Sequence, residues 1–291
     1  MTLTGIHLLL TYQCTHECDH CFVWGSPQQQ GTMSVRQIET ILKQARDLRT
    51  VDWIYFEGGE PFLYYPVLVR GAEEASLLGF RVGIVSNAYW ATSVEDACEW
   101  LRPFARTVQD FSVSSDVHHE NGPEECHPEN ARRAAERLGI PVQTLRTADS
   151  DRPSDEEGPL MYRGRAAQKL VPEEGRRHPS ELRECPYEDL RDPGRVHVDA
   201  FGNVHLCQGI SLGNLFETPL ERICATYDPD SHPIAGPLLA GGPHELARRY
   251  DVPEAEGYAD ACHLCDEIRR SLRPRFPEVL RPDAMYGAPE S

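Results

Sequence analysis

The alternation of short apolar runs with amphipathic stretches in the first half of this chain constrains its fold more than any other feature. The apolar runs predict strands at 6–11, 53–57, 80–86, 109–114 and 142–147. The stretches between them predict helices at 34–48, 66–78, 94–104 and 128–138, with Ser34 and Ser93 as N-caps. Strands that alternate with helices form a parallel sheet with crossover helices, and five or six such units give a partial (β/α)5–6 barrel.

The second half of the chain has a different character. A run rich in Asp, Glu, Pro and Ser at 148–159 indicates a loop or linker. Further on, segments 195–200 and 203–207 predict a β-hairpin, and short helices are expected near 219–225, 244–250 and 261–272. We therefore expect an α/β protein of two domains, a partial barrel over residues 1–170 and a small α+β domain over residues 171–291.

Composition argues against several classes of partner. The chain has 291 residues and a formal net charge of −17, which does not suit nucleic acid or an anionic membrane surface. No run approaches the roughly 20 apolar residues of a membrane span, and the N-terminus lacks the basic segment of a signal peptide. Ten cysteines in such a chain indicate metal binding more than disulfides, so we expect a cytoplasmic metal-binding protein.

Three of the cysteines follow the first predicted strand in a C-x3-C-x2-C pattern: Cys14, Cys18 and Cys21. Three thiolates on one short loop can hold three irons of a 4Fe-4S cluster, which leaves the fourth iron without a protein ligand. An open coordination position is typical of a catalytic metal site rather than a structural one. The alternatives are a zinc knuckle and a cysteine-rich loop without metal.

Further motifs follow the other predicted strands. They are Gly58-Gly59-Glu60-Pro61 after the second strand, Ser86-Asn87 after the third, Ser112, Ser114 and Asp116 at the fourth, and Leu145, Arg146 and Thr147 at the fifth. Parallel barrels place their active sites at the C-terminal ends of the strands. The motifs should therefore meet at one rim and form a single active site.

The cysteine triad together with Gly58-Gly59-Glu60-Pro61 resembles the signature of the radical S-adenosylmethionine (SAM) superfamily, over about residues 6–170. The resemblance implies that the open iron binds the methionine end of SAM, and that the glycine segment and the Glu60 carboxylate contact its ammonium group. It also implies contacts of Ser86 and Asn87 with the methionine part, of Ser112, Ser114 and Asp116 with the ribose, and of Leu145 with the adenine. His20 stands where the family often carries an aromatic residue.

A second set of four cysteines lies in the C-terminal part of the chain: Cys185, Cys207, Cys262 and Cys265. Four thiolates satisfy every iron of a 4Fe-4S cluster. The arrangement resembles the twitch domain, a shortened relative of the SPASM auxiliary-cluster domain, and the architecture is similar to that of the 2-deoxy-scyllo-inosamine dehydrogenases of this superfamily. A structural zinc site with four cysteine ligands is the alternative.

The resemblance implies reductive cleavage of SAM to a 5′-deoxyadenosyl radical that abstracts a hydrogen atom from the substrate. The second cluster would accept an electron, so that a small-molecule metabolite is dehydrogenated, with a flavodoxin- or ferredoxin-type electron donor. Arg163 and Arg165 are candidates for recognition of a substrate carboxylate or phosphate, His119 for a proton relay, and Cys126 for a hydrogen donor.

Three other functions stay open. Some relatives modify precursor peptides by crosslinking or side-chain oxidation, and epimerisation would be a redox-neutral outcome in which Cys126 donates hydrogen. The chain starts at the barrel, without the N-terminal module that some peptide-modifying enzymes use, which favours a small molecule. A cluster-binding sensor or scaffold without activity is the non-enzymatic alternative.

Overall fold

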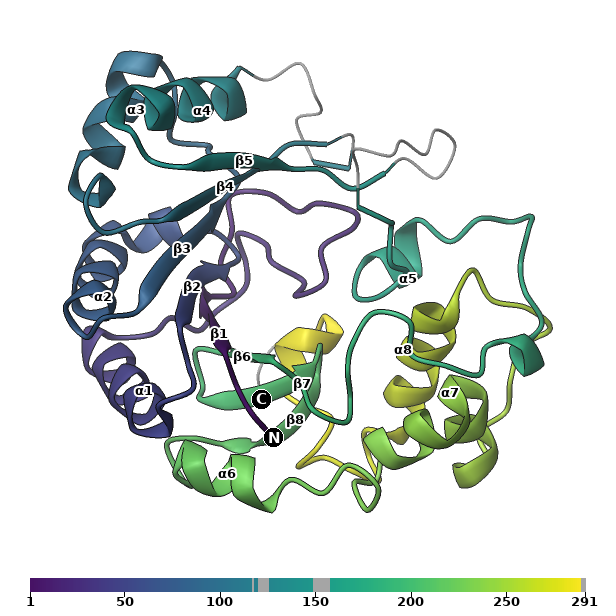
Figure 1. The fold of residues 1–291 in the computed structure, drawn as a ribbon. Coiled ribbons are helices and arrows are strands. Elements are labelled where there is room, and N and C mark those ends of the chain that lie inside the picture. The colour runs from purple at the N-terminus through teal and green to yellow at the C-terminus, as the bar shows by residue number, and fades with distance from the viewer. Residues whose placement is uncertain (117, 120–125, 149–157, 289–291) are drawn as a thin grey trace.

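The computed structural model describes residues 1–116, 118–119, 126–148 and 158–288 of the chain. Most of the linker predicted at 148–159 therefore lies outside the described residues. Within the described part, eight strands form a single sheet in the order β5-β4-β3-β2-β1-β6-β7-β8 (Figure 1).

The strand predictions for the first half are confirmed, and the sheet continues into the second half. The strands are β1 (Gly5–Thr11), β2 (Trp53–Gly58), β3 (Arg81–Ser86), β4 (Asp110–Ser114), β5 (Val142–Leu145), β6 (Arg195–Val198), β7 (Asn203–Cys207) and β8 (Ile210–Asn214). β1 to β5 pair in parallel, as predicted. The predicted hairpin is also present as the antiparallel pair β6–β7. β6 adds in parallel to the free edge of β1, so residues from the predicted second domain extend the sheet of the first.

Helices cover the convex face of the curved sheet (Figure 1). They are α1 (Val35–Leu48), α2 (Tyr65–Leu77), α3 (Val94–Leu101) and α4 (His127–Leu138). The helices of the second half are α5 (Ala166–Lys169), α6 (Leu220–Thr226), α7 (Ala235–Tyr250) and α8 (Ala261–Leu272). Ser34 and Ser93 cap α1 and α3 through their side chains, as predicted. The sequence predicted only the second half of α7, which is kinked at Gly241 and Gly242.

Successive side chains of β1 point alternately to the hydrophobic core on the convex face and to the concave face of the sheet. Ile6, Leu8 and Leu10 belong to the large core that also contains buried residues of α1 and α2. The intervening side chains point to the opposite, concave face because successive residues of a strand alternate. One of them is His7, which pairs in register with Tyr55 of β2 and His197 of β6.

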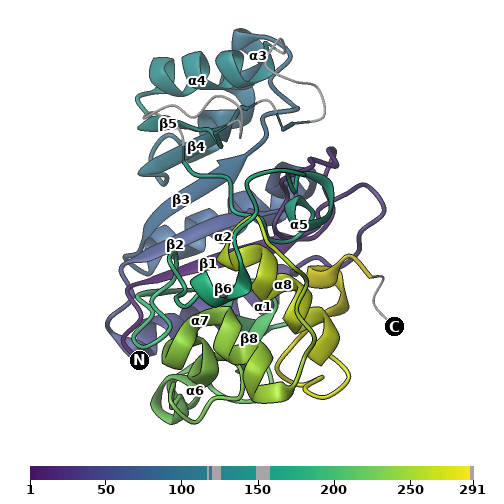
Figure 2. The same cartoon turned by 90° about the vertical axis from the view of Figure 1, so that its right-hand side faces the viewer.

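The C-terminal helices close the open side of the sheet. Figure 2, which views the molecule from that side, shows α7 and α8 in front of its lower half. A second core joins Leu9 and Tyr12 from the first part of the chain to Leu238 of α7 and Leu264 of α8. Among the described residues, no helix is long and apolar enough to cross a membrane.

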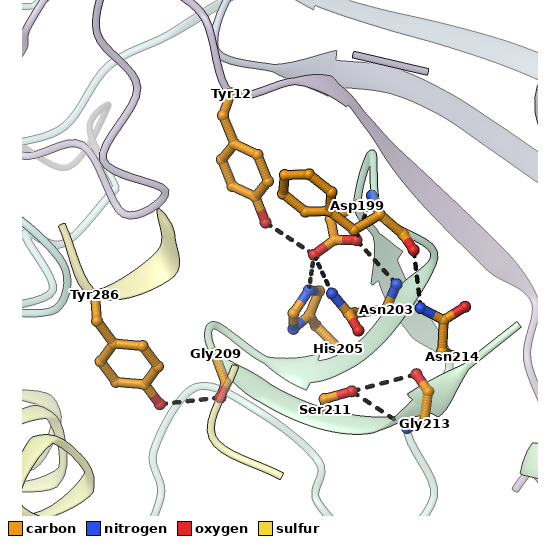
Figure 3. Close-up of polar contacts among 10 residues, drawn as sticks. Tyr12, Asp199, Asn203, His205, Gly209, Ser211, Gly213, Asn214 and Tyr286 are labelled. Atoms are coloured by element: carbon orange, nitrogen blue, oxygen red, sulfur yellow. Dashed lines mark hydrogen bonds and ion pairs between the residues drawn. The ribbon is translucent and has the colours of Figure 1, made fainter. Parts of the chain in front are cut away.

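A buried carboxylate connects the end of β1 to the β6–β7 hairpin (Figure 3). Oδ2 of Asp199 accepts hydrogen bonds from the Tyr12 hydroxyl (3.0 Å), from Nδ2 of Asn203 (2.9 Å) and from Nε2 of His205 (3.0 Å). Asp199 and His205 have no solvent-exposed area. Tyr12 precedes the cysteine triad by two residues, and His205 stands two residues before Cys207. The network therefore fixes the segments that carry both cysteine sets relative to one another.

His232 makes the stability of the C-terminal part depend on pH. Its Nδ1 accepts hydrogen bonds from the backbone N–H groups of Ile234 (3.2 Å) and Ala235 (3.0 Å) at the start of α7. Burial lowers the pKa of His232 from 6.5 to about 4, so the folded protein holds the neutral ring. Between these two pH values the unfolded chain binds a proton that the folded chain does not, and stability falls as the pH decreases.

We expect this residue to lower the free energy of unfolding by at most about 3 kcal/mol between pH 7 and pH 4. Asn at this position keeps an acceptor oxygen but does not titrate. Urea unfolding of His232→Asn should therefore show a shallower decline over that range than the wild type, and an identical decline in both proteins would contradict this account.

Candidate active site

The three N-terminal cysteines lie on the loop that leaves β1. The loop aims backbone N–H groups at two of the sulfurs: His16 N–H donates to Sγ of Cys14 (3.4 Å) and Gly25 N–H donates to Sγ of Cys21 (3.2 Å). Burial, followed by the nearby Glu60 carboxylate, raises the pKa of the Cys14 thiol. A coordinating metal deprotonates a thiol outright, and N–H donors are the groups that tune the sulfurs of an iron–sulfur cluster. The donor set therefore fits a 4Fe-4S cluster.

The motifs predicted for one rim do meet there. The three cysteines line a cavity of about 140 Å³, which we call the cysteine cavity. Its other walls include Gly58 and Gly59 from β2, Ser86 and Asn87 after β3, Ser114 at the end of β4, and His119.

Gly58 and Gly59 are required because the chain passes very close to the segment before the triad. A Cβ on Gly59 would lie 2.1 Å from the carbonyl oxygen of Gln13, and one on Gly58 would lie 2.4 Å from that of Thr11. Gly58 also has a φ of +138°, which side chains of L-residues rarely adopt. The backbone N–H of Gly59 donates to the Thr11 carbonyl (2.7 Å), which joins the two segments beside the cavity.

Glu60 lies among three hydrogen-bond donors behind the cavity. Its side chain is fully buried and accepts hydrogen bonds from the backbone N–H of Phe62 (3.0 Å), the Ser86 hydroxyl (3.0 Å) and the backbone N–H of Asn87 (2.8 Å). Glu60 is therefore bound to the turn after β2 and to the segment at the end of β3, and it is not part of the lining of the cavity. Burial raises the pKa of Glu60 to about 7 despite these three donors.

Ser86 and Pro61 are buried beside Glu60. The Ser86 hydroxyl donates to Glu60 and accepts from the backbone N–H of Ala88 (2.9 Å) and from Nε1 of Trp90 (3.1 Å), so its oxygen is fully used. Pro61 is buried at the start of a 3-10 turn. Ser86 also lines the cavity with the three cysteines, so the predicted contact of Ser86 with SAM stays a prediction.

Asn87 does reach the cavity. Its Nδ2 lies 3.5 Å from Sγ of Cys14, 3.1 Å from the Thr15 hydroxyl and 2.7 Å from Nδ1 of His16. Its backbone N–H is held by Glu60. Glu60 therefore fixes Asn87, whose amide side chain contacts the cysteine loop and whose residue lines the cavity.

Glu60→Gln tests this support. The new amide group would oppose at least one of the three donors around position 60, and a buried polar group left unsatisfied costs about 1–3 kcal/mol. We expect a loss of stability of that size in urea unfolding together with weaker SAM binding in equilibrium dialysis. Glu39→Gln, on the exposed face of α1, is the matched control and should change neither quantity. Unaltered stability and SAM affinity in Glu60→Gln would contradict the supporting role.

Of the residues predicted to contact the ribose and adenine, three line a cavity and one is buried. Ser114, Asp116 and Leu145 line a second, larger cavity of about 370 Å³, which we call the central cavity. Ser112 lies deeper inside the barrel, where its hydroxyl accepts from Nε2 of Gln143 (3.0 Å). Ser112 is only 2% exposed and is not part of the lining of either cavity.

Asp116 is the centre of a histidine cluster at the rim. Its carboxylate accepts from Nδ1 of His119 (2.9 Å), from the backbone N–H of Thr147 (3.1 Å) and from the backbone N–H of His118 (3.0 Å). Burial alone would raise its pKa, but the hydrogen bond from His119 and the neighbouring histidines lower it to about 2. Burial lowers the pKa of His20 to about 4, so this ring is neutral.

Two of the predicted catalytic residues line neither the cavity of the cysteine triad nor the central cavity. Arg165 is 2% exposed, and its guanidinium donates to the carbonyl oxygens of Cys18 (2.6 Å) and Gly25 (2.8 Å). These hydrogen bonds hold the cysteine loop in place. Cys126 is exposed at the start of α4 and lines neither the cysteine cavity nor the central cavity.

Arg163 occupies the position between the two cysteine sets. It lines the central cavity and also a cavity formed by the C-terminal cysteines. Its Nη1 donates to Oε1 of Glu188 (3.2 Å) and lies 3.7 Å from Sγ of Cys207, and its guanidinium carbon lies 5.3 Å from the centre of the Phe22 ring.

The C-terminal cysteines converge on one cavity, which Cys185, Cys207, Cys262 and Cys265 all line. Burial raises the pKa of Cys265 to about 12. Arg269 lines the same cavity, is 2% exposed, and donates from Nε to the carbonyl oxygen of Cys265 (3.3 Å). Two buried guanidinium groups beside four thiols suit an anionic metal–thiolate centre, because buried charges require compensation.

One group of residues in the barrel interior was not foreseen from the sequence. His7, Glu57 and His197 come together on the concave face, where Oε1 of Glu57 lies 3.3 Å from Nδ1 of His7 and 3.0 Å from Nε2 of His197. Glu57 lines both the cysteine cavity and the central cavity. His7 could have been noticed as a polar residue in the otherwise apolar run of β1, but its convergence with His197 depends on the pairing of β1 with β6.

Comparison with known proteins identifies the domain. Residues 8–144 match the family model of the radical SAM superfamily, so this part of the chain is a radical SAM domain. That family implies a 4Fe-4S cluster and SAM as cofactors. A segment of 115 residues is 26% identical to YydG of Bacillus subtilis, which is named for peptide biosynthesis. The match covers 39% of this chain and 36% of YydG.

The fold is similar to that of solved radical SAM proteins. BtrN, in complex with AdoMet and 2-DOIA, matches with 15% identity and a TM-score of 0.50 over 91% of this chain and 92% of BtrN. SuiB of Streptococcus suis, bound to S-adenosylmethionine, matches with 13% identity and a TM-score of 0.53 over 78% of this chain and 66% of SuiB. anSMEcpe, with bound AdoMet and Cp18Cys peptide, matches with 11% identity and a TM-score of 0.54 over 94% and 97%. At these identities the likeness concerns the fold.

Proposed function

We propose that this chain is a radical SAM enzyme that oxidises a small-molecule metabolite by two electrons with the help of a second 4Fe-4S cluster. A 4Fe-4S cluster with SAM on its open iron supplies the electron that cleaves SAM to methionine and a 5′-deoxyadenosyl radical, which removes a hydrogen atom from the substrate. Loss of one further electron and one proton from the substrate completes the oxidation. Cys14, Cys18 and Cys21 would hold the first cluster.

The position of the central cavity carries this proposal. It shares His20, Glu57 and Ser114 with the cysteine cavity, and it shares Arg163 with the cavity of the four C-terminal cysteines. A substrate in the central cavity would therefore lie between the two sets of thiols. That arrangement suits a reaction in which one centre starts the oxidation and the other accepts the remaining electron.

The spacing of the C-terminal sulfurs supports a cluster over zinc. A tetrahedral zinc site with Zn–S bonds of about 2.3 Å holds its sulfurs roughly 3.8 Å apart. The described residues contain groups of three or more ligand atoms that lie within 4.8 Å of one another. None of the four C-terminal cysteines belongs to such a group in the described part of the chain. No three of these sulfurs therefore lie as close together as the ligands of a single zinc ion, and this spacing favours a cluster.

The size of the central cavity supports a small substrate. Its volume of about 370 Å³ falls within the range of roughly 300–1,000 Å³ that is typical of small-molecule sites. BtrN, a radical SAM dehydrogenase, was solved with 2-DOIA and matches nearly the whole of this chain. We therefore favour dehydrogenation of a cyclitol or a related metabolite in the cytoplasm, with electrons from a flavodoxin- or ferredoxin-type donor.

A peptide is the second candidate substrate. YydG is named for peptide biosynthesis, and anSMEcpe was solved with the Cp18Cys peptide. This alternative keeps the same first cluster and changes only what enters the central cavity.

Product analysis separates these functions. The reduced holoenzyme would be incubated anaerobically with SAM and either a cyclitol panel that includes 2-DOIA or the Cp18Cys peptide. We expect one of the cyclitols to be converted to a product lighter by two hydrogen atoms, with formation of 5′-deoxyadenosine. Modified peptide without cyclitol oxidation would support the second candidate instead. A product that has the mass of the substrate when formed in H2O, and that carries deuterium when formed in D2O, would indicate epimerisation and contradict net oxidation.

A further inference from the structure

His7, Glu57 and His197 bring two imidazoles and one carboxylate to a single point inside the barrel. One ligand atom from each residue lies within 4.8 Å of the others. The three side chains are only 14–16% exposed. Two imidazoles with one carboxylate are a donor set that binds divalent transition metals such as zinc, iron and manganese.

The rigid centre of the sheet positions all three residues. His7 of β1 is the register partner of His197 on β6. Glu57 stands two residues beyond Tyr55, the partner of His7 on β2, and therefore points to the same face. The His7 ring stacks on Tyr55 with centroids 4.6 Å apart, and the His197 ring meets the edge of Phe22 at 5.8 Å. Sites on packed strands hold ligand geometry more tightly than sites on loops.

The three side chains lie close together, but their polar atoms are not all hydrogen-bonded. Oε1 of Glu57 is 3.3 Å from Nδ1 of His7 and 3.0 Å from Nε2 of His197. Nevertheless, in the part of the chain that the structure describes, buried Oε1 of Glu57 and Nδ1 of His7 have no partner with hydrogen-bond alignment. Ligands bound to one metal at 2.0–2.2 Å lie about 3–3.5 Å from each other, which matches the two distances.

The group also has access to exogenous ligands. Glu57 lines the central cavity, and His7 lines another cavity of about 410 Å³ near the start of the strands. We propose that His7, Glu57 and His197 bind one divalent transition-metal ion at the floor of the central cavity. Three protein ligands leave a coordination position open, and here an oxygen or nitrogen donor in the central cavity would fill it. The site uses none of the cysteines and does not depend on the proposed function.

Manganese binding to the holoprotein tests the proposal. Both clusters would be reconstituted and oxidised, loosely bound iron removed with a chelator, and Mn²⁺ titrated while the EPR signal of the free ion is recorded. Mn²⁺ prefers carboxylate and imidazole over thiolate ligands, so occupied or vacant cysteine sites should contribute little. We expect one Mn²⁺ to bind per chain and Zn²⁺ to displace it.

Ligand variants then locate the ion. Removing a residue that only hydrogen-bonds to a metal ligand weakens metal binding about 10–100-fold. Replacing a ligand itself should have a larger effect, so we expect Glu57→Gln and His197→Asn to weaken Mn²⁺ binding by about 100-fold or more. Glu254→Gln is the matched control, because Glu254 also pairs with a histidine, at 2.9 Å from Nδ1 of His244. Within the described part of the chain, this pair belongs to no group of three ligand atoms. Its Mn²⁺ affinity should equal that of the wild type. Circular dichroism and iron content confirm that each variant is folded.

Three results would overturn the proposal. The first is a wild-type holoprotein that binds no Mn²⁺, and the second is Mn²⁺ binding that survives in both Glu57→Gln and His197→Asn. The third is loss of binding in Asp116→Asn without loss in the first two variants, because this would assign the ion to the second candidate group, His20, Asp116 and His119.

Discussion

Cys14→Ala is expected to abolish SAM cleavage completely. Cys14 supplies one of only three thiolates on the loop after β1, and its sulfur is held by the His16 N–H and approached by Asn87. Without it the cluster would have two irons open instead of one. Formation of 5′-deoxyadenosine by the reduced protein, measured by chromatography, should fall to the level of a reaction without enzyme.

Cys98→Ala is the control for this result. Cys98 is partly buried on α3, where it packs against the large core and lines neither cavity of the site. The same chemical change at that position should leave SAM cleavage unaltered. If Cys14→Ala cleaves SAM at the wild-type rate, the assignment of the cluster to this loop is wrong.

Asp199→Asn is expected to cause the largest loss of stability. The Asp199 carboxylate accepts hydrogen bonds from the side chains of Tyr12, Asn203 and His205 and from two backbone N–H groups. Asparagine replaces one carboxylate oxygen with an NH2 group. This NH2 group would face other hydrogen-bond donors in a site that has no solvent-exposed area. Breaking a buried charged network in this way costs about 3–5 kcal/mol.

Anaerobic denaturation with guanidinium would measure this change in the free energy of unfolding. Asp192→Asn is a matched control, because Asp192 also accepts a backbone N–H, that of Thr2 (2.8 Å), but lies at the surface. Its effect should stay within about 0.5 kcal/mol. A small effect of Asp199→Asn as well would mean that the network does not hold the hairpin to the end of β1.

Local patterns in the sequence predicted most of the barrel. Short apolar runs and capped amphipathic stretches are determined by neighbouring residues, and β1 to β5 with their helices follow them closely. The strand pairing of β6 with β1 could not be predicted in the same way, because it joins residues about 190 positions apart. The same pairing brings His197 to His7, and for this reason the group in the barrel interior was not foreseen.

Residue type predicted which segments form the site but not which way each side chain points. Glu60 and Ser86 belong to the predicted motifs, yet the turn after β2 directs the Glu60 carboxylate to the Ser86 hydroxyl at the end of β3, and the two side chains hydrogen-bond to each other. Arg165 is similar, because its direction depends on the carbonyl groups of the folded cysteine loop. The cysteines were easier to predict, since spacing alone brings three of them onto one loop, and the four C-terminal ones line one cavity.

The content of iron, labile sulfide and zinc after anaerobic reconstitution tests the central claim that two iron–sulfur clusters flank the central cavity. We expect about eight irons per chain and no zinc in the wild type, and about four irons in Cys262→Ala/Cys265→Ala, which should still cleave SAM. About four irons in the wild type, with or without one zinc, would contradict the claim. The redox chemistry would then be confined to the first cluster, and a redox-neutral reaction would replace oxidation as the proposed function.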